Sequence, residues 1–278
     1  MHLSWLPSTL PSLFVKTLLT ETGLYPSKRR EILFLIHFFL PVAMGWSLAV
    51  VVRHAVGGTF SELGLILLMA GIGAAYSLDR LIERELQSAW LNQALWCVLF
   101  FCGGVICIVL ANSRSNPNFL KIVLILTAVS LLYTQLKKFP IVKTVIVAVS
   151  WTWSCSTLPR TTGGTDWLSY DITLPLILLI AAGCILCDLK DQHEDHHRGI
   201  PTLPVLLGTQ ASCLIATGMV VVAGAMAAFH RQFGITVGAG LLAIAAQFPS
   251  VLSIRPGGAI LVDTILTIPG ILITAGLF

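Results

Sequence analysis

Long apolar stretches separated by short linkers run through the sequence, and they restrict the folds that it can adopt. A helix that crosses a membrane needs about 20 predominantly apolar residues. The chain of 278 residues offers nine such stretches, at residues 31–54, 59–79, 89–111, 118–136, 140–158, 172–190, 209–229, 233–253 and 257–277. Charged residues make up 11% of the chain, against about 25% in soluble proteins. We therefore predict an all-α integral membrane protein.

The nine stretches leave no room for a second, soluble domain. We predict two parts, an N-terminal interfacial segment at residues 1–30 and a bundle of nine transmembrane helices at residues 31–278. The first part is rich in leucine and ends in three basic residues, but it has neither a basic start nor a small-residue cleavage site. We therefore expect it to lie on the membrane surface and not to act as a signal peptide.

The distribution of lysine and arginine predicts the orientation of the bundle. In a nine-helix topology, twelve of the 17 Lys and Arg residues lie on the same side as the N-terminus. Because positive charge is retained on the cytoplasmic side, we expect a cytoplasmic N-terminus in a multi-pass protein of the cell (inner) membrane. The formal net charge of +4 then reflects topology and attraction to membrane lipid. Nothing in the charge pattern indicates a nucleic-acid partner.

An acidic segment, CDLKDQHEDHHRGIPTLPVLLG at residues 187–208, overlaps the end of one apolar stretch. On a helix that turns about 100° per residue, Asp188, Asp191 and Asp195 share one face, whereas Glu194 points elsewhere. Three carboxylates held this close repel one another and favour a bound cation, and oxygen ligands suit Mg2+. The alternative interpretation is a solvated cytoplasmic loop that is acidic without binding anything.

A second acidic cluster lies at the end of the stretch 59–79. Asp79 and Glu83 are four residues apart and share one helical face, with Arg80 between them. Both acidic clusters fall on the predicted cytoplasmic side, so they could face each other across one cavity. Two carboxylate clusters can hold a diphosphate through Mg2+, because each metal ion completes its coordination with phosphate oxygens and water. Alternatively, these charges only anchor the end of a span at the membrane interface.

A third loop on the same side, LLYTQLKKFPIVK, supplies positive charge. Tyr133 and Lys137 stand about one helical turn apart on one face. A lysine close to a departing diphosphate stabilises the charge that develops in the transition state. The positive-inside rule alone would also place lysines here.

Cysteine and histidine suggest a rival metal site in the same segment. Cys184, Cys187, His193, His196 and His197 are Zn2+ ligand types at a plausible spacing. Cysteine is also common as a small residue inside membrane spans, and all seven cysteines fall in predicted helices. We therefore expect neither disulfides nor a soluble zinc fold.

Three motifs resemble those of the UbiA superfamily of intramembrane prenyltransferases. DLKDQHEDHHRGIPTLP looks like the second signature of that family, Asp-x-x-Asp-x-x-x-Asp followed by Arg, Gly and Thr-Leu-Pro. AYSLDRLIE resembles the first signature, Asn-Asp-x-x-Asp-x-x-x-Asp, and YTQLKKF resembles a Tyr-x-x-x-Lys-Arg element. The resemblance covers nearly the whole chain. It implies nine helices around a central cavity, with Mg2+ holding a prenyl diphosphate between the two aspartate motifs.

Carried over residue by residue, the resemblance implies two sets of site residues. The catalytic and Mg2+-binding residues are Asp79, Glu83, Asp188, Asp191 and Asp195. The diphosphate-binding residues are Arg80, Tyr133, Lys137, Lys190 and Arg198. The first motif departs from the family pattern, because Ala75 and Tyr76 replace its Asn and first Asp and Glu83 replaces its last Asp. Either one metal position is weaker here or the substrate is held differently.

These motifs predict a Mg2+-dependent prenyltransferase, which ionises a prenyl diphosphate and joins the prenyl group to a lipophilic acceptor such as an aromatic compound. Tyr133 or Trp151 would shield the allylic cation with the face of its ring. Two alternatives stay open. The same site in a terpene cyclase would act on a prenyl diphosphate without an acceptor, and the altered first motif would also suit a non-catalytic isoprenoid-binding or transport protein.

Overall fold

The computed structural model describes most of the chain as helices. The described residues are 26–57, 61–82, 141–160, 169–255 and 257–277, with a few short stretches and single residues between 95 and 139. Within this part of the chain, every regular element is a helix, which confirms the predicted all-α class.

The described helices follow one another along the chain. In chain order they are α2 (Pro26–Val56), α3 (Glu62–Ile82), α6 (Val142–Thr157), η1 (Leu158–Arg160), α7 (Tyr170–Asp188), η2 (Leu189–Asp191), α8 (Gln192–His197), α9 (Leu203–Phe229), α10 (Phe233–Ala245), α11 (Pro249–Leu252) and α12 (Gly257–Thr274). Here η1 and η2 are single 3-10 turns.

The described helices overlap seven of the nine predicted spans, although the span 233–253 consists of two helices, α10 and α11, with a break between them. The stretches at 89–111 and 118–136 lie largely outside the described residues, so the number of nine helices stays a prediction. Four helical segments are long and apolar enough to cross a membrane, namely Phe39–Val56, Tyr170–His197, Leu203–Phe229 and Gly257–Thr274. They agree with the predicted integral membrane protein.

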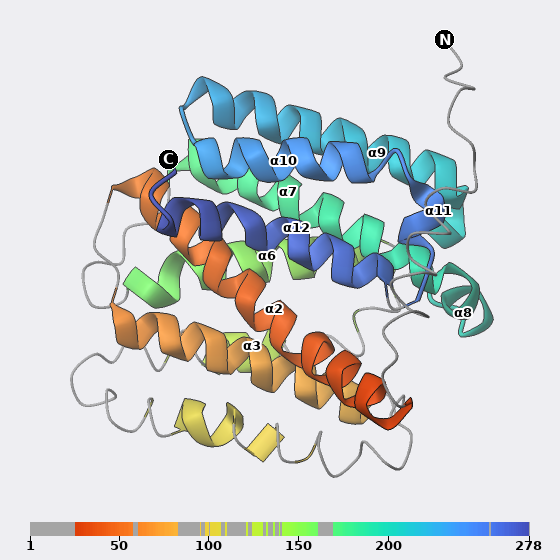
Figure 1. Ribbon diagram of the computed structural model, residues 1–278, viewed down its shortest axis with the longest axis horizontal. Helices are drawn as coiled ribbons and strands as arrows, with labels where there is room; N and C mark the ends of the chain where they lie inside the picture. The colour runs from red at the N-terminus through yellow and green to blue at the C-terminus, as the bar shows by residue number, and fades with distance from the viewer. Residues whose placement is uncertain are drawn as a thin grey trace.

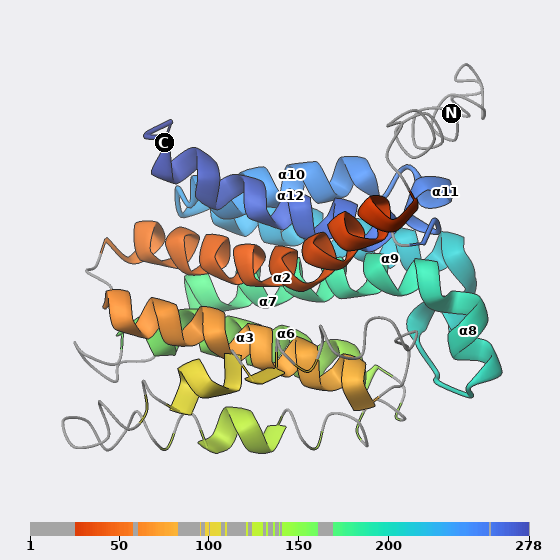
Figure 2. The same cartoon turned by 60° about the horizontal axis from the view of Figure 1, so that its bottom comes forward.

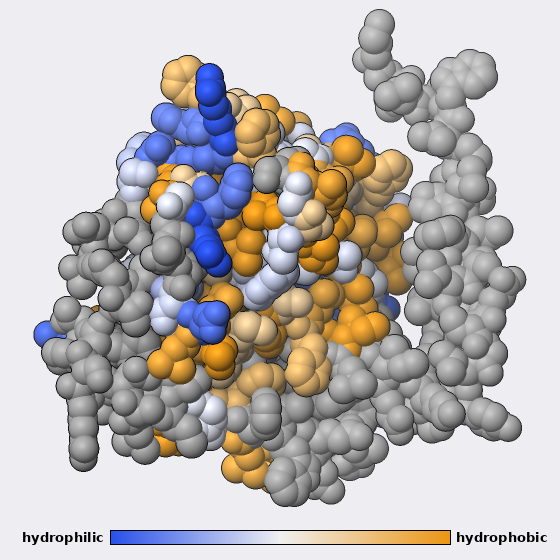
Figure 3. All heavy atoms as spheres, turned by 60° about the vertical axis from the view of Figure 1, so that its left-hand side comes forward, coloured by the Kyte–Doolittle hydropathy of each residue, from blue (hydrophilic) through white to orange (hydrophobic). Residues whose placement is uncertain are grey.

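Large apolar side chains also cover the outside of the bundle. On α9, for example, Leu214 is 74% and Phe229 is 84% exposed. Figure 3 shows hydrophobic residues over much of the described surface on one face. Such a surface is unfavourable in water and is the one that lipid chains contact in a membrane.

α7 is the central helix of the bundle. It packs against α9 and α6, and it also contacts α12 and α10; Figures 1 and 2 show it between the α9–α10 pair and α6. Its sequence is apolar on every side, and residues such as Leu176, Ile185 and Leu186 are almost completely buried. A helix that is hydrophobic all round belongs in the interior. Its last residue, Asp188, is therefore held at the edge of the core.

α2 and α12 approach each other closely at a polar contact inside the core. The Ser47 hydroxyl is fully buried; it donates a hydrogen bond to the Leu266 carbonyl and accepts one from the Gly270 amide, each at 2.9 Å. Those two backbone groups are one helical turn apart, next to Pro269, which cannot donate a backbone hydrogen bond. A side chain that inserts into the backbone ladder in this way satisfies groups that a helical proline disturbs.

Candidate functional site

The acidic segment lies at one end of the bundle, where α7 changes into a different kind of helix. α7 ends at Asp188, the 3-10 turn η2 follows, and α8 begins at Gln192. The predicted ladder therefore does not run along one continuous α-helix. In a 3-10 turn, side chains three residues apart lie directly above one another. The angle between the Asp188 and Asp191 side chains around the helix axis therefore differs from the angle expected for an α-helix.

The chain turns back into the bundle immediately after α8. Gly199 has a left-handed backbone conformation (φ 66°), which glycine adopts without steric cost at the end of a helix. The Ile200 amide then donates to the Asp195 carbonyl at 2.8 Å. This reversal leads the chain into α9 and places Thr202 and Asp195 in the interior, where both are buried.

Asp188 forms an ion pair with a residue that the sequence motifs did not indicate. Its Oδ1 accepts a hydrogen bond from the Lys143 Nζ at 2.6 Å, and Asp188 is only 4% exposed. Lys143 is the second residue of α6, where a positive charge is unfavourable because the N-terminus of a helix carries a partial positive charge itself. The ion pair with Asp188 offsets that unfavourable interaction.

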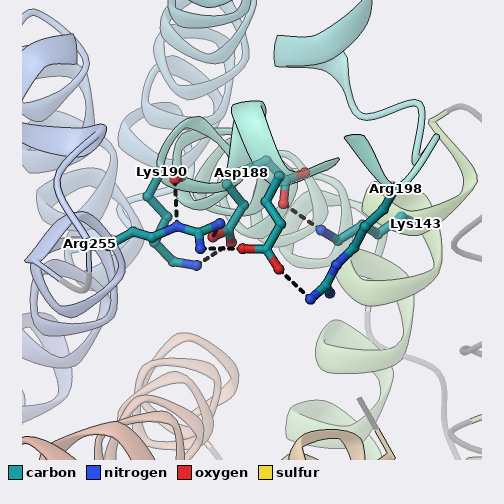
Figure 4. Close-up of polar contacts among 7 residues, drawn as sticks. Lys143, Asp188, Lys190, Arg198 and Arg255 are labelled. Carbon is teal, nitrogen blue, oxygen red and sulfur yellow. Dashed lines mark hydrogen bonds and ion pairs between the residues drawn. The ribbon is translucent and has the colours of Figure 1, made fainter. Parts of the chain in front are cut away.

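A second set of ion pairs surrounds Asp191 and Glu194. Asp191 pairs with Lys190 and, at 2.6 Å, with Arg255 from the loop between α11 and α12. Arg255 also pairs with Glu194 and donates through Nε to the Lys190 carbonyl at 2.9 Å. Glu194 in turn pairs with Arg198. Figure 4 shows Arg255 and Lys190 on one side of the acidic residues and Lys143 and Arg198 on the other.

Asp195 differs from the other acidic residues because part of its carboxylate has no partner. It is 7% exposed, and its Oδ2 is buried without a hydrogen-bond partner among the described residues. The buried hydroxyl of Thr202 lies near this carboxylate but does not close a hydrogen bond of normal geometry with it. A buried polar atom without a partner costs about 1–3 kcal/mol. Such atoms are suited to a bound ligand, and a carboxylate oxygen fits a hard cation such as Mg2+.

The described charges of the cluster balance. The acidic members are Asp188, Asp191, Glu194 and Asp195, and the basic members are Lys143, Lys190, Arg198 and Arg255. Four negative and four positive charges give a net charge of zero. A neutral cluster of this kind has ligands for a metal ion and for an anion at the same place, provided that its internal pairs can exchange partners.

An open pocket of about 410 Å3 lies beside these ion pairs. Its lining is Lys190, His193, Glu194, His197 and Arg255. The rings of His193 and His197 stack edge to face with their centres 4.5 Å apart. Basic and imidazole side chains outnumber the single carboxylate, so the pocket is chemically suited to an anionic group.

The zinc alternative finds no support in the described residues. No three His, Cys, Asp or Glu side chains among them are arranged to hold a metal ion, and Cys184 and Cys187 are free thiols. The same observation holds for the ladder, in which Asp188 and Asp191 are occupied by ion pairs. Coordination of Mg2+ would therefore need oxygen atoms from elsewhere.

The remaining predicted site residues are described only in part. Asp79 and Arg80 lie in the last turn of α3, and their side chains are outside the described part of the chain, as are Glu83, Tyr133 and Lys137. α3 and α7 end at the same end of the bundle (Figure 1). The first motif and the ladder are therefore on the same side, as the topology predicted.

Tyr76, which stands where the family motif has an acid, has an aromatic neighbour. Its ring meets that of Trp151 edge to face, with ring centres 6.4 Å apart and the planes at 83°. Both side chains are half-buried and pack against the hydrophobic core. The contact joins α3 to α6, the helix that carries Lys143 in its first turn.

Comparisons with known proteins agree with this arrangement. A family model described as "UbiA prenyltransferase family" matches residues 79–256, a range that begins at Asp79 and contains the whole ladder. No curated protein matches the chain.

Solved structures of two archaeal proteins resemble the fold. A UbiA homolog from Aeropyrum pernix K1, in its apo form, has a TM-score of 0.61 at 14% identity, over 84% of this chain and 98% of that one. A UbiA homolog from Archaeoglobus fulgidus bound to GPP and Mg2+ has a TM-score of 0.58 at 15% identity, over 87% of this chain and 99% of that one. At such low identity, the likeness shows that the fold is shared.

Proposed function

The chain belongs to the UbiA prenyltransferase family, and we propose that it is a Mg2+-dependent intramembrane enzyme that transfers a prenyl group from its diphosphate to a lipophilic acceptor. The observation that carries this proposal is the neutral cluster at the end of α7. It combines carboxylates, one with a buried oxygen atom that lacks a partner, with basic side chains at the end of an apolar bundle. A prenyl diphosphate needs a charged environment for its diphosphate group and an apolar one for its isoprenoid tail.

The carboxylates would hold the metal. We assign this role to Asp188, Asp191 and Asp195 on one side and to Asp79 and Glu83 on the other. Mg2+ bound there would neutralise the diphosphate and make it a better leaving group. A UbiA homolog from Archaeoglobus fulgidus bound to DMAPP and Mg2+, at 14% identity and a TM-score of 0.54, supports this assignment, as does the homolog bound to GPP and Mg2+.

The basic side chains would bind the diphosphate oxygens. Lys190 and Arg198 were predicted for this role, and the ion pairs add Lys143 and Arg255. Arg80, Tyr133 and Lys137 complete the predicted set from the other two loops. A positive charge that is already in place stabilises the leaving group as the bond to the prenyl carbon breaks.

The apolar helices would hold the isoprenoid tail. The Tyr76–Trp151 pair lies on the two helices that lead to Asp79 and Lys143, so it is suited to shield the allylic cation with the faces of its rings. An acceptor would then trap the cation. The excess of basic residues on the side of the N-terminus supports a cytoplasmic site in the cell membrane.

The first test is diphosphate release by protein purified in detergent. Geranyl, farnesyl and geranylgeranyl diphosphate are offered separately, each with a quinol-type aromatic acceptor and without one, and the lipids are extracted for mass spectrometry. We expect release from at least one donor, and a loss of about 100-fold or more when EDTA replaces Mg2+ because the leaving group loses its main positive charge. Restoring Mg2+ should restore the rate.

The products separate the alternatives. A prenylated acceptor supports transfer, whereas a cyclic hydrocarbon formed without an acceptor would identify a terpene cyclase. Binding of a prenyl diphosphate without release, for all three donors and with the acceptor present, would contradict the proposed enzyme and favour an isoprenoid-binding protein.

A further inference from the structure

The ion pair between Lys143 and Asp188 involves the first carboxylate of the ladder. Asp188 is buried, its partner comes from a helix 45 residues earlier, and the two atoms are 2.6 Å apart. The Lys143 side chain is more accessible, with 23% of its surface exposed. Asp188 is therefore fixed in the core, while the Lys143 side chain is partly accessible.

A lysine and a metal ion compete for such a carboxylate. Two cations on one carboxylate repel each other strongly when water is largely excluded. A divalent ion can therefore bind Asp188 well only when the Lys143 ammonium moves away. Moving that ammonium to a place without an anion would leave a charge unpaired, which is costly in a partly buried site.

The diphosphate is such an anion. A lysine is a compact charge on a flexible stem of four carbon atoms, so its ammonium can change partners without a movement of the helix. We propose that Lys143 passes from Asp188 to the diphosphate when metal and substrate bind. Lys143 thus holds Asp188 before binding and contacts the leaving group afterwards.

This inference rests on the proposed function and adds that metal binding at Asp188 depends on the presence of diphosphate. Without diphosphate, Lys143 occupies the carboxylate and lowers the affinity for metal. With diphosphate present, the lysine has a second anion to bind, and the carboxylate becomes available. By thermodynamic linkage, metal and diphosphate then increase each other's affinity.

The test is a pair of binding measurements on Lys143→Met. The affinity for Mn2+ alone is measured from the EPR signal of the free ion. The affinity for inorganic diphosphate is measured by equilibrium dialysis at a fixed, saturating concentration of free Mn2+. We expect Lys143→Met to bind Mn2+ about 10-fold more tightly than the wild type and diphosphate about 10-fold more weakly, within the usual range of coupling between two ligands.

The opposite signs distinguish this role from a structural one, because a merely destabilised site would lose affinity for both ligands. Lys143→Arg retains the charge and should bind both ligands within about threefold of the wild type. Lys121→Met removes the same charge from an exposed helical position and should change neither affinity. In an Asp188→Asn background, Lys143→Met should no longer raise the Mn2+ affinity, because the competition for the carboxylate is gone.

Unchanged or weaker Mn2+ binding in Lys143→Met would overturn the inference, and so would unchanged diphosphate binding. If the Met variant does not purify as a folded protein, Lys143→Gln removes the charge with a polar side chain and is judged by the same criteria. The assay uses no turnover. Opposite shifts without release from any prenyl donor would leave the inference standing and refute the proposed enzyme, whereas turnover without these shifts would refute the inference alone.

Discussion

Asp191→Ala is expected to reduce Mg2+-dependent diphosphate release by about a thousandfold or more. The side chain is a member of the proposed metal site and lies between Lys190 and Arg255. Its removal takes away a carboxylate and the anion that pairs with Lys190, whereas Arg255 keeps its ion pair with Glu194. Loss of one preorganised charged group next to the reacting atoms costs about 100- to 1,000-fold, and here the effects on metal and diphosphate add. The measurement is the release assay at saturating Mg2+, with Asp191→Asn as the variant of nearly equal shape.

Glu194→Gln is the matched control for that variant. Glu194 belongs to the same cluster and pairs with the same Arg255, as well as with Arg198, but it lies outside the proposed metal ligands. We expect it to reduce release by less than about tenfold, because a partly exposed ion pair contributes little. Equal losses in the two variants would mean that Asp191 acts only by holding Arg255, and its role as a metal ligand would have to be abandoned.

Gly270→Ala is expected to destabilise the bundle, although the same change usually stabilises a helix. A Cβ atom at Gly270 would lie 2.5 Å from the Cα and 2.7 Å from the Cβ of Ser47 on α2. Because the Cα of Ser47 belongs to the backbone of α2 and cannot rotate away as a side chain would, α2 and α12 must separate. Overpacking of this kind costs about 1–3 kcal/mol, which corresponds to a fall of about 2–12 °C in Tm at the roughly 2–4 °C per kcal/mol typical of larger domains.

Gly240→Ala provides the comparison. Gly240 lies in α10, and a Cβ atom there would meet nothing within 4 Å. Alanine is preferred over glycine inside a helix by about 0.5–1 kcal/mol, so the Tm of this variant in detergent should stay the same or rise slightly. A fall of similar size in both variants would show that the close approach of α2 and α12 is not what limits substitution at Gly270.

The sequence predicted the fold class and most helix positions because both depend on local composition. The predicted span 172–190 and the observed α7 differ by two residues at each end. α9 is numbered from Leu203, but its backbone is non-helical at Gly208 (φ 81°, ψ 167°), so the part after this kink begins at the predicted start of the span, residue 209. The glycine therefore marks a real boundary, and the sequence did not indicate the short helical segment that precedes it.

The site was harder to predict because its partners come from distant parts of the chain. The acidic ladder is visible as a local pattern, and the family membership that it suggested is confirmed. Lys143 and Arg255 meet Asp188 and Glu194 across 45 and 61 residues, so in sequence they looked like ordinary cytoplasmic charges. Lys190, which the family resemblance assigned to diphosphate binding, pairs with its neighbour Asp191.

The Ser47 contact also has a consequence for how the protein is made. Its two partners on α12 follow Ser47 by 219 and 223 residues, so a ribosome delivers α2 to the bilayer long before they exist. During that interval the face of α2 around Ser47 is covered by lipid or by other segments waiting to assemble. The contact between α2 and α12 can form only after α12 is inserted. A nascent chain stalled before that point would leave the face of α2 around Ser47 accessible to the quality-control machinery of the membrane.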